Sequence, residues 1–417
     1  MKLLIFLFLL TLSVSLSKKR KHHKRYQSTS SDSSSVEEKP IQKVSDSQHP
    51  YFNCKGTLRQ SFAIELSFQY TGRNVVCSPV SALLPLGKLI LGAEGQTRAE
   101  LTKVIGDQKK SSLTESFTDL IKKLQYVHGV KLDVASRIYV AEEAEILPKF
   151  TESAKTIFNS DVEKISFKQP KQAADEINGW VSRQTNGMIP LLVQPDQIIP
   201  DASLIIINAV YFKGRWRDPF KEINVGDFYA PSGQKKVQLM SHKTTCRYTK
   251  SNILNAEILE IPYEGLEASF VIVLPLEKTG LPLLLNQLKL APSLLNNALK
   301  KLKMKFVHVT VPKFSITTSF DLKDMYEKVG VKEMMSPNSG LKNIVKNQEL
   351  KVSSAIQKAV IEVHERGTEA SGASAIITAF GAPSSVVEPV KFIADHPFLF
   401  YVQAHTEQLF AGIYSEP

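Results

Sequence analysis

A run of small residues near the C-terminus constrains this chain more than any other feature. Residues 365–375 are mostly Gly, Ala, Ser and Thr, and they follow residues 358–363, which alternate as a strand does. No strong helix or turn signal occurs from this run to Pro383. Small, uncharged side chains at every second position suit a segment that must enter between two existing strands, because larger or charged groups would be buried there. We interpret the run as a loop that can become a strand.

The composition is that of a globular protein with ample material for a large core. The chain has 417 residues, of which 43% are hydrophobic and 22% are charged. No obvious linker interrupts it after residue 50, so we expect a single domain over residues 51–417.

The first 17 residues have the features of a secretory signal peptide. Lys2 precedes an apolar run over residues 3–12, and Ser15 and Ser17 occupy the positions of small residues before a cleavage site. The apolar run is too short to span a bilayer of about 30 Å. We therefore expect cleavage before Lys18, secretion into the extracellular space and no association with a membrane.

Residues 18–50 form a basic and Ser-rich tail that we expect to be disordered, because it lacks apolar residues that could offset the entropy of ordering. The six cations of residues 18–25 account for six units of the net charge of +11. They are Lys18, Lys19, Arg20, Lys21, Lys24 and Arg25. Two interpretations stay open: a solubilising tail, or a site for a polyanion such as a sulfated glycosaminoglycan. Secretion makes nucleic acid a poor candidate partner.

The three cysteines give an odd count for a secreted chain. Cys77 follows Val75 and Val76, which indicates a buried thiol and not a bridge. A disulfide between Cys54 and Cys246 stays open.

Hydrophobic periodicity predicts a mixed α+β fold. Phe62, Leu66 and Tyr70 would share one helical face. Further helices are predicted at residues 83–91, 113–124 and 174–185. Continuous apolar runs at residues 204–212 and 270–274 suit strands buried on both faces, whereas residues 306–314 alternate as a strand with one buried face does. Helices dominate the first half and strands the second, which favours separate α and β layers.

No motif for catalysis or for a cofactor is present. The nearest approach to a hydrolase nucleophile elbow, at residues 372–376, lacks the final Gly, and the neighbours Asp395 and His396 do not by themselves make a triad. Residues 92–95 lack the Lys and Ser/Thr of a phosphate-binding loop and are better interpreted as a turn that ends a helix. We expect neither an enzyme nor a bound metal or other cofactor.

Seven ordered blocks of sequence resemble the serpin family, and the resemblance covers residues 55–417. The blocks lie at residues 74–81, 92–97, 177–187, 208–216, 311–314, 365–375 and 395–398. The resemblance implies one serpin domain with three β-sheets and about nine helices, and an exposed reactive-centre loop over about residues 365–391. It also implies a monomer whose partner is a target serine protease. The protease attacks the loop, forms an acyl-enzyme, and is trapped when the cleaved loop inserts as a new central strand.

The resemblance assigns the hinge of this loop. Its residues are Glu365, Gly367, Thr368, Glu369, Ala370, Ser371, Gly372, Ala373 and Ser374. The side chains that would turn inward on insertion are Thr368, Ala370, Gly372, Ser374, Ile376, Thr378 and Phe380. None of these carries a charge, and Glu369 falls on the outward face, as the cost of burying a carboxylate requires.

Other family positions lie under and above the expected opening of the central sheet. Ser78, Ser81 and Asn208 match a buried polar cluster, in which Gln357 replaces the usual His. Gln does not titrate near neutral pH, which puts a pH-triggered opening through that position in doubt. Trp216 matches an aromatic residue at the top of the opening, and Lys313 with Glu365 matches an ion pair that braces the hinge.

The position of the scissile bond stays open between two neighbours. The family count from Gly367 gives Gly381–Ala382, whereas side-chain chemistry favours Phe380–Gly381, because Phe fills a chymotrypsin-like pocket. No Lys or Arg occurs between Ala370 and Val390, so trypsin-like proteases are poor targets. A chymotrypsin-like or elastase-like target fits, and a cysteine protease stays open.

Two functions from different classes are compatible with these residues. The first is a secreted suicide inhibitor of a chymotrypsin-like or elastase-like protease. The second is a non-inhibitory serpin-fold binding or carrier protein, with a polyanion as one candidate ligand. The small, neutral hinge favours the inhibitor.

Overall fold

The computed structural model of the chain describes residues 72–105, 110–125, 127–160, 162–346, 348–366, 388–405 and 407–417. All of them belong to one compact unit, residues 49–417. These described residues form three sheets of nine, five and two strands together with eight α-helices. The helical face predicted at Phe62, Leu66 and Tyr70 lies outside the described residues. Where the structure is described, no helix is long and apolar enough to cross a bilayer.

The five-stranded sheet carries the candidate site. Its strand order is β11 (Phe314–Asp321), β13 (Val352–Val363), β5 (Leu204–Gly214), β2 (Val130–Ala141) and β4 (Val162–Ile165). β5 and β13 are parallel, and each pairs antiparallel with its other neighbour. The apolar run predicted at residues 204–212 is therefore confirmed as a strand buried on both faces.

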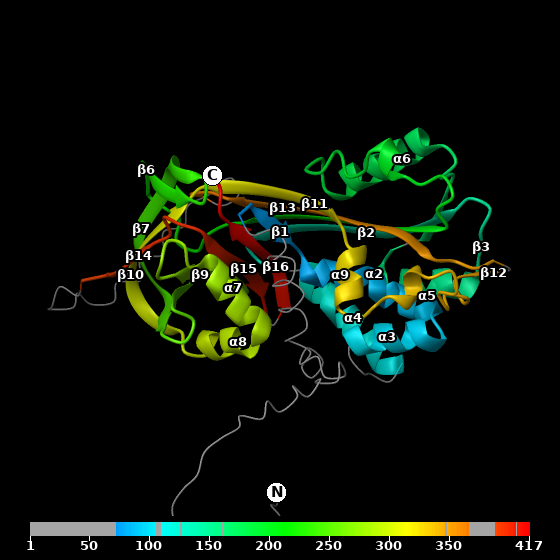
Figure 1. Ribbon diagram of the computed structural model, residues 1–417, viewed down its shortest axis with the longest axis horizontal. Helices are drawn as coiled ribbons and strands as arrows, with labels where there is room; N and C mark the ends of the chain where they lie inside the picture. The colour runs from blue at the N-terminus through cyan, green and yellow to red at the C-terminus, as the bar shows by residue number, and fades with distance from the viewer. Residues whose placement is uncertain are drawn as a thin grey trace, which may run out of the picture. The chain divides into compact units, whose positions relative to one another are not determined.

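The nine-stranded sheet packs beside it (Figure 1). Its strands, in order, are β1 (Val75–Cys77), β16 (Glu407–Tyr414), β15 (Phe398–Ala404), β9 (Ala268–Pro275), β8 (Ala256–Pro262), β7 (Gly233–Ser251), β10 (Lys303–Pro312) and β14 (Val390–Ile393), and β6 (Glu222–Ala230) pairs with β7. β12 (Val345–Lys346) and β3 (Glu145–Ile146) make the third sheet.

The strand predicted at residues 306–314 is wrong in its extent. The alternation is real, because Val307 and Val309 are buried while Phe306 is 41% exposed. However, β10 ends at Pro312 and β11 begins at Phe314 in a different sheet. Pro312 has no N–H to continue a ladder, and the Lys313 N–H bonds to the Gln238 carbonyl before the chain changes sheets.

The predicted helices at residues 83–91, 113–124 and 174–185 are confirmed as parts of α2 (Pro79–Gly92), α4 (Lys110–Gln125) and α6 (Pro170–Gln184). The other helices are α3 (Gly95–Ile105), α5 (Pro148–Phe158), α7 (Leu281–Leu290), α8 (Ser293–Leu299) and α9 (Lys323–Lys328). The turn predicted at residues 92–95 joins α2 to α3.

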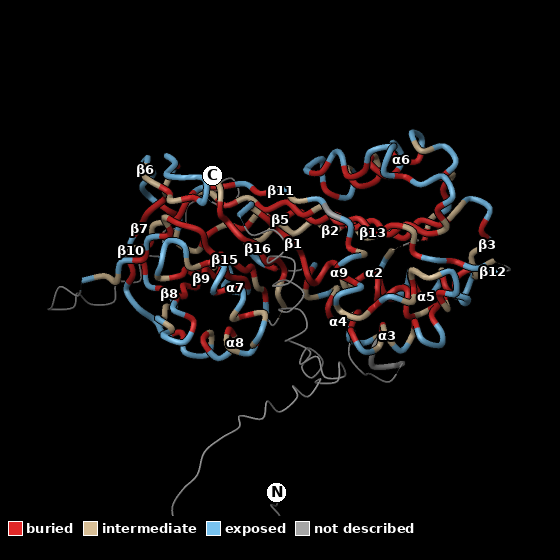
Figure 2. The backbone as a smooth tube through the Cα atoms, viewed as in Figure 1, coloured by how far each residue is buried: buried red, intermediate tan, exposed pale blue. Residues whose placement is uncertain are grey.

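The five-stranded sheet is covered on both faces. α2 lies under it with α3, α4 and α5, while α6 lies across the opposite face (Figure 1). The main core fills the space on the α2 side and includes Phe212 and Ile361, and a second core under α6 includes Trp180 and Tyr211. Figure 2 shows that β5 is buried along almost its whole length and that β13 is mostly buried, whereas much of β2 is of intermediate burial. The middle of β5 is therefore packed on both faces.

Candidate functional site

The line between β5 and β13, here called the seam, has a buried polar cluster beneath its middle. Asn208 and Gln357 are register partners across the seam, and each side chain is 0% exposed. Both reach α2, which begins below them. The Gln357 amide accepts a hydrogen bond from the Ser78 N–H at 3.1 Å and donates to Ser81 Oγ at 3.1 Å and to the Ser78 carbonyl at 3.2 Å. The Asn208 amide donates to the Ser81 carbonyl.

This cluster forms because α2 starts at the same place. Ser78 is the N-cap of α2: its Oγ accepts from the Ser81 N–H at 3.3 Å, and Pro79 follows at the first helical position. The cap fixes the Ser78 backbone groups that Gln357 uses. The structure thus brings together the four residues predicted from the sequence, and it shows Gln357 making three hydrogen bonds within this cluster.

The upper end of the seam, which is the end where β13 finishes at Val363, is held by backbone groups as well as side chains. Trp216 stacks on Tyr263 with ring centroids 4.5 Å apart, and its Nε1–H donates to the His364 carbonyl at 2.7 Å. The Phe220 N–H donates to the Glu365 carbonyl at 3.0 Å. These bonds fix the course of the chain immediately after β13 ends.

Lys313 and Glu365 form an ion pair of 3.0 Å at the same place. The pKa of Glu365 is lowered, first by a hydrogen bond from its own backbone N–H and then by Lys313. Lys313 lies between β10 and β11, so the pair ties the end of β13 to the β11 side of the sheet and does not cross the seam.

Several predicted residues lie outside the described residues. They are the hinge residues Gly367, Thr368, Glu369, Ala370, Ser371, Gly372, Ala373 and Ser374, the bonds at Phe380, Gly381 and Ala382, the basic residues of the tail, and Cys54. The Cys54–Cys246 pairing therefore stays a prediction. Cys77 is buried as predicted, and burial raises the pKa of its thiol.

Asp395 and His396 are bonded to each other but not arranged for catalysis. His396 Nδ1 lies 2.7 Å from Asp395 Oδ1, and Nε2 lies 2.8 Å from the Pro275 carbonyl oxygen. Both ring nitrogens are thus engaged in holding β14 and β15 against β9. The pair serves the packing of the nine-stranded sheet.

Sequence reasoning missed His242 on β7. Its side chain is buried, and within the described part of the chain neither ring nitrogen has a hydrogen-bond partner. The ring packs edge-on against Phe220, with centroids 4.5 Å apart, and Phe220 in turn bonds to Glu365. Burial lowers the pKa of His242 to about 4, although Asp218 acts in the opposite direction. No local sequence pattern marks this residue, because its burial depends on the packing of the segment around Phe220.

Comparison with known proteins finds similar sequences and similar structures. The family model described as Serpin (serine protease inhibitor) matches residues 58–417. Antichymotrypsin-2 of Bombyx mori is 35% identical over 346 residues, which cover 82% of this chain and 92% of that protein. The crystal structure of Serpin48 from Tenebrio molitor superimposes with a TM-score of 0.77 at 28% identity and covers 87% of this chain and 98% of that one. Native protease nexin-1 with heparin superimposes with a TM-score of 0.73 at 28% identity and the same coverage.

The Gln357 hydrogen bonds should contribute measurably to stability. Replacing Gln357 with Leu leaves the Ser78 N–H without its partner in a buried place, and we expect the free energy of unfolding to fall by about 2–4 kcal/mol. Urea unfolding of the full chain measures this. Gln96→Leu is the control, because Gln96 is exposed and its amide donates to the Glu100 side chain on the next turn of α3. Equal stability of the two variants would contradict the role assigned to Gln357.

His242 should make the protein less stable in mild acid. Its pKa is lower in the folded chain than the ordinary value of about 6.5, so between those values the unfolded chain binds the extra proton and stability falls as pH falls. Between pH 7 and pH 4.5 this group should remove about 2 kcal/mol. Urea unfolding at both pH values measures the loss of stability between pH 7 and pH 4.5. This loss should be smaller by about 2 kcal/mol in His242→Gln than in the parent chain. An unchanged difference would mean that other groups cause the acid sensitivity.

Proposed function

Since this chain belongs to the serpin family, we propose that it is a secreted inhibitor that traps its target serine protease covalently by inserting its reactive-centre loop between β5 and β13. Membership in this family of protease inhibitors makes inhibition, and not catalysis, the function to explain. The trapping mechanism, the target and the secretion are the proposal.

The parallel pairing of β5 with β13 is the observation that carries the proposal. Their register runs from Val352 opposite Leu204 to Glu362 opposite Lys213. β13 leads directly into residues 367–387, so a strand that turns back from its end would run antiparallel to both β13 and β5. Insertion would replace one parallel ladder by two antiparallel ladders, and antiparallel pairing is the more stable of the two per residue.

The energetic gain is large on the scale of protein stability. A gain on the order of a dozen ladder hydrogen bonds, at roughly 1 kcal/mol net each, is comparable to a whole-domain stability of about 5–15 kcal/mol. An uncleaved chain with a five-stranded sheet is therefore kinetically trapped. Inserting about 14 residues at about 3.3 Å each would carry an attached protease roughly 45 Å along the sheet, which is far enough to distort its catalytic site before the ester is hydrolysed.

The sequence of the loop supports insertion over a binding or carrier role. The inward positions from Thr368 to Phe380 are uncharged, so they can be buried against the core beneath the seam. The absence of Lys and Arg between Ala370 and Val390 disfavours trypsin-like targets and leaves chymotrypsin-like and elastase-like proteases as the candidates. Both Phe380–Gly381 and Gly381–Ala382 remain candidate scissile bonds.

Incubation with chymotrypsin or elastase should give a complex that survives SDS. Gly372→Arg would have to bury a guanidinium on insertion, and we expect it to raise the number of inhibitor molecules consumed per trapped protease by roughly tenfold or more. Ala373→Arg is the matched control, because position 373 is predicted to face outward. Mass spectrometry of the released C-terminal peptide identifies the scissile bond.

Clean cleavage near residue 380 without any stable complex, across a panel of proteases, would reject the inhibitor and favour the non-inhibitory binding protein. Unchanged trapping by Gly372→Arg would reject the insertion step alone.

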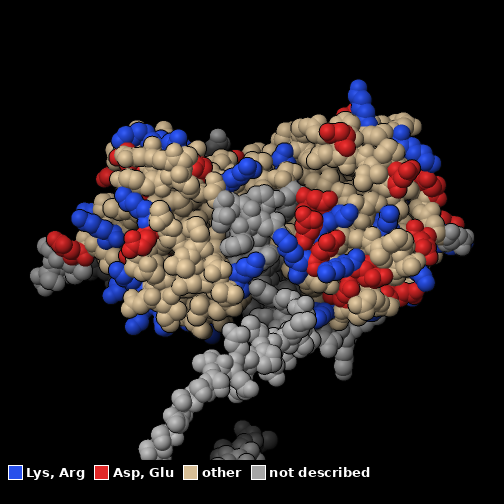
Figure 3. Space-filling view, in the orientation of Figure 1, with Lys and Arg blue, Asp and Glu red and all other residues tan. Residues whose placement is uncertain are grey.

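We also propose that the mature chain begins at Lys18 and that its basic tail binds a sulfated polysaccharide. Residues 18–25 contain six cations and no acidic residue. On the face shown in Figure 3, the Lys and Arg residues over α3, α4 and α5 are instead interspersed with Asp and Glu. The structural similarity to protease nexin-1, whose crystal structure includes heparin, supports this class of ligand.

Replacing the six cations of residues 18–25 with Ser should lower the salt concentration at which the mature chain elutes from a heparin column, because fewer counterions are displaced on binding. Replacing Lys122 and Lys123 of α4 is the control. If elution changes only in the α4 variant, the heparin site lies on α4 and not in the tail. If elution changes in neither variant, the tail does not bind heparin and serves as a solubilising segment.

A further inference from the structure

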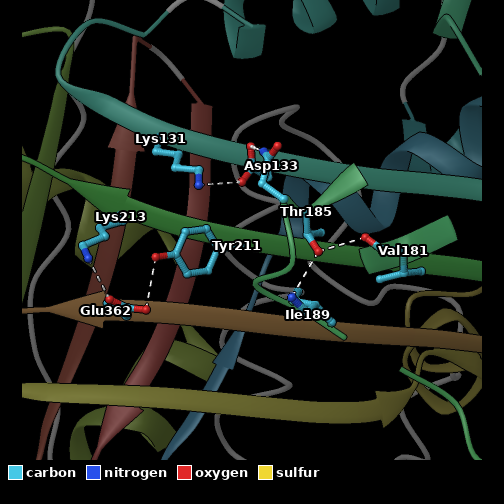
Figure 4. Close-up of polar contacts among 9 residues, drawn as sticks. Lys131, Asp133, Val181, Thr185, Ile189, Tyr211, Lys213 and Glu362 are labelled. Atoms are coloured by element: carbon cyan, nitrogen blue, oxygen red, sulfur yellow. Dashed lines mark hydrogen bonds and ion pairs between the residues drawn. The ribbon is translucent and has the colours of Figure 1, made fainter. Parts of the chain in front are cut away.

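One side chain of β13 reaches directly across the seam to β5. Glu362 Oε1 accepts a hydrogen bond from the Tyr211 hydroxyl at 3.1 Å, and Oε2 lies 3.2 Å from Lys213 Nζ (Figure 4). Lys213 is the register partner of Glu362, and Tyr211 lies two positions earlier on β5. Both oxygens of one carboxylate are thus bonded to the opposite strand of the seam.

These contacts are partly shielded from water. The side chains of Lys213 and Glu362 are 20% and 24% exposed, and Tyr211 is almost fully buried. Burial by itself would raise the pKa of Glu362, but the Lys213 ammonium and the Tyr211 hydroxyl outweigh it and hold that pKa below its usual range. The carboxylate is therefore ionised, and both contacts are charge-assisted and stronger than they would be in open solvent.

The neighbouring strand β2 holds Tyr211 in place. Lys131 Nζ lies 5.5 Å from the centre of the Tyr211 ring, and it is 3.6 Å from Asp133 on the same strand. Asp133 in turn accepts a hydrogen bond from Asn186 at 3.2 Å, just beyond α6. The end of α6 is closed by Thr185, whose Oγ1 donates to the Val181 carbonyl and accepts from the Ile189 N–H (Figure 4). Tyr211 is thus fixed by groups on both sides of its strand.

An additional strand in the seam is incompatible with these contacts. Neighbouring strands lie about 4.8 Å apart, so one inserted strand would separate β5 from β13 by about 9.6 Å. Glu362 could no longer bond to Tyr211 or Lys213 at close to 3 Å. It lies three residues before Glu365, at the end of the seam where an inserting loop would enter, so its contacts must break in the first step.

We propose that Glu362, Tyr211 and Lys213 form a latch that controls how readily the seam opens and thereby divides attacking proteases between trapping and release. This inference rests on the proposed function. A weaker latch lets the sheet open sooner, so the loop inserts before the ester is hydrolysed but also inserts more often without cleavage. The Lys313–Glu365 pair differs in that it does not cross the seam, because Lys313 lies between β10 and β11.

The latch can be tested without a protease. A synthetic peptide with the sequence of residues 368–380 is added to the full mature chain as a substitute for the inserting strand. Its incorporation is followed by native electrophoresis and by tryptophan fluorescence. Glu362→Gln removes the charge and keeps an oxygen for Tyr211, and we expect incorporation to be roughly three to ten times faster. Glu163→Gln is the matched control, because Glu163 pairs with Arg137 across β2 and β4, parallel strands of the same sheet that stay together.

Faster incorporation in Glu362→Gln but not in Glu163→Gln supports the latch. Equal rates of peptide incorporation in the parent chain, Glu362→Gln and Glu163→Gln would overturn the latch, and so would a lack of incorporation in all three. A double-mutant cycle with Lys213→Gln guards against a general loss of stability: the rate increases of the single variants should not multiply in the double variant if the two residues act on each other. A parent chain that incorporates the peptide but traps no protease would reject the proposed function and leave the latch intact.

Discussion

The hydrogen-bonded pairing of β5 with β13 is the interaction on which the rest of this structure depends. It is a complete parallel ladder within a sheet whose neighbouring pairs, β13 with β11 and β5 with β2, are antiparallel. The backbone groups along the seam are therefore satisfied, and yet the segment that leaves β13 could satisfy them in two ladders instead of one. Under the proposed function, the same sheet would also accept a sixth strand. Whether it stays as it is depends on barriers to separating two strands, and the residues around the seam supply them.

These barriers are of two physical kinds. In the middle of the seam, Asn208 and Gln357 are fully buried and bond to the first turn of α2, so separating the strands must break neutral hydrogen bonds in a place without water. At the upper end, Glu362 bonds to Tyr211 and Lys213 through a charged group that is partly exposed. The neutral cluster is insensitive to salt, whereas salt weakens the partly exposed charged contacts. Opening can therefore be adjusted at the end of the seam without weakening its middle.

The sequence predicted the elements of this arrangement better than their contacts. The apolar runs that became β5 and β9 and the periodicity of α2, α4 and α6 are local signals, so they could be found without the structure. Ser78, Ser81, Asn208 and Gln357 were found through family motifs, and their geometry could not have been derived from spacing, because Gln357 is 279 residues from Ser78. The break at Lys313 was missed, since an alternating pattern does not show that a chain changes sheets. His242 and Glu362 were missed for a related reason. The burial of the first depends on Phe220, and the partners of the second, about 150 residues away, are identified only by the register of β13 on β5.

The residues that hold the seam closed are different from the residues at the proposed scissile bond. This difference affects how such a protein can change its target. In the proposed mechanism the protease would recognise Phe380 to Ala382, whereas the residues that hold the seam lie on β5, β13 and α2. A substitution at the scissile bond changes which protease attacks but leaves the contacts of Glu362 and Gln357 as they are. A substitution at those contacts changes the rate of insertion for every protease alike. The inward positions from Thr368 to Thr378 lie between the seam and the proposed scissile bond. They must meet two requirements, because they must first be part of an exposed loop and then be buried as a strand. This double requirement accounts for the absence of charge at every inward position from Thr368 to Thr378.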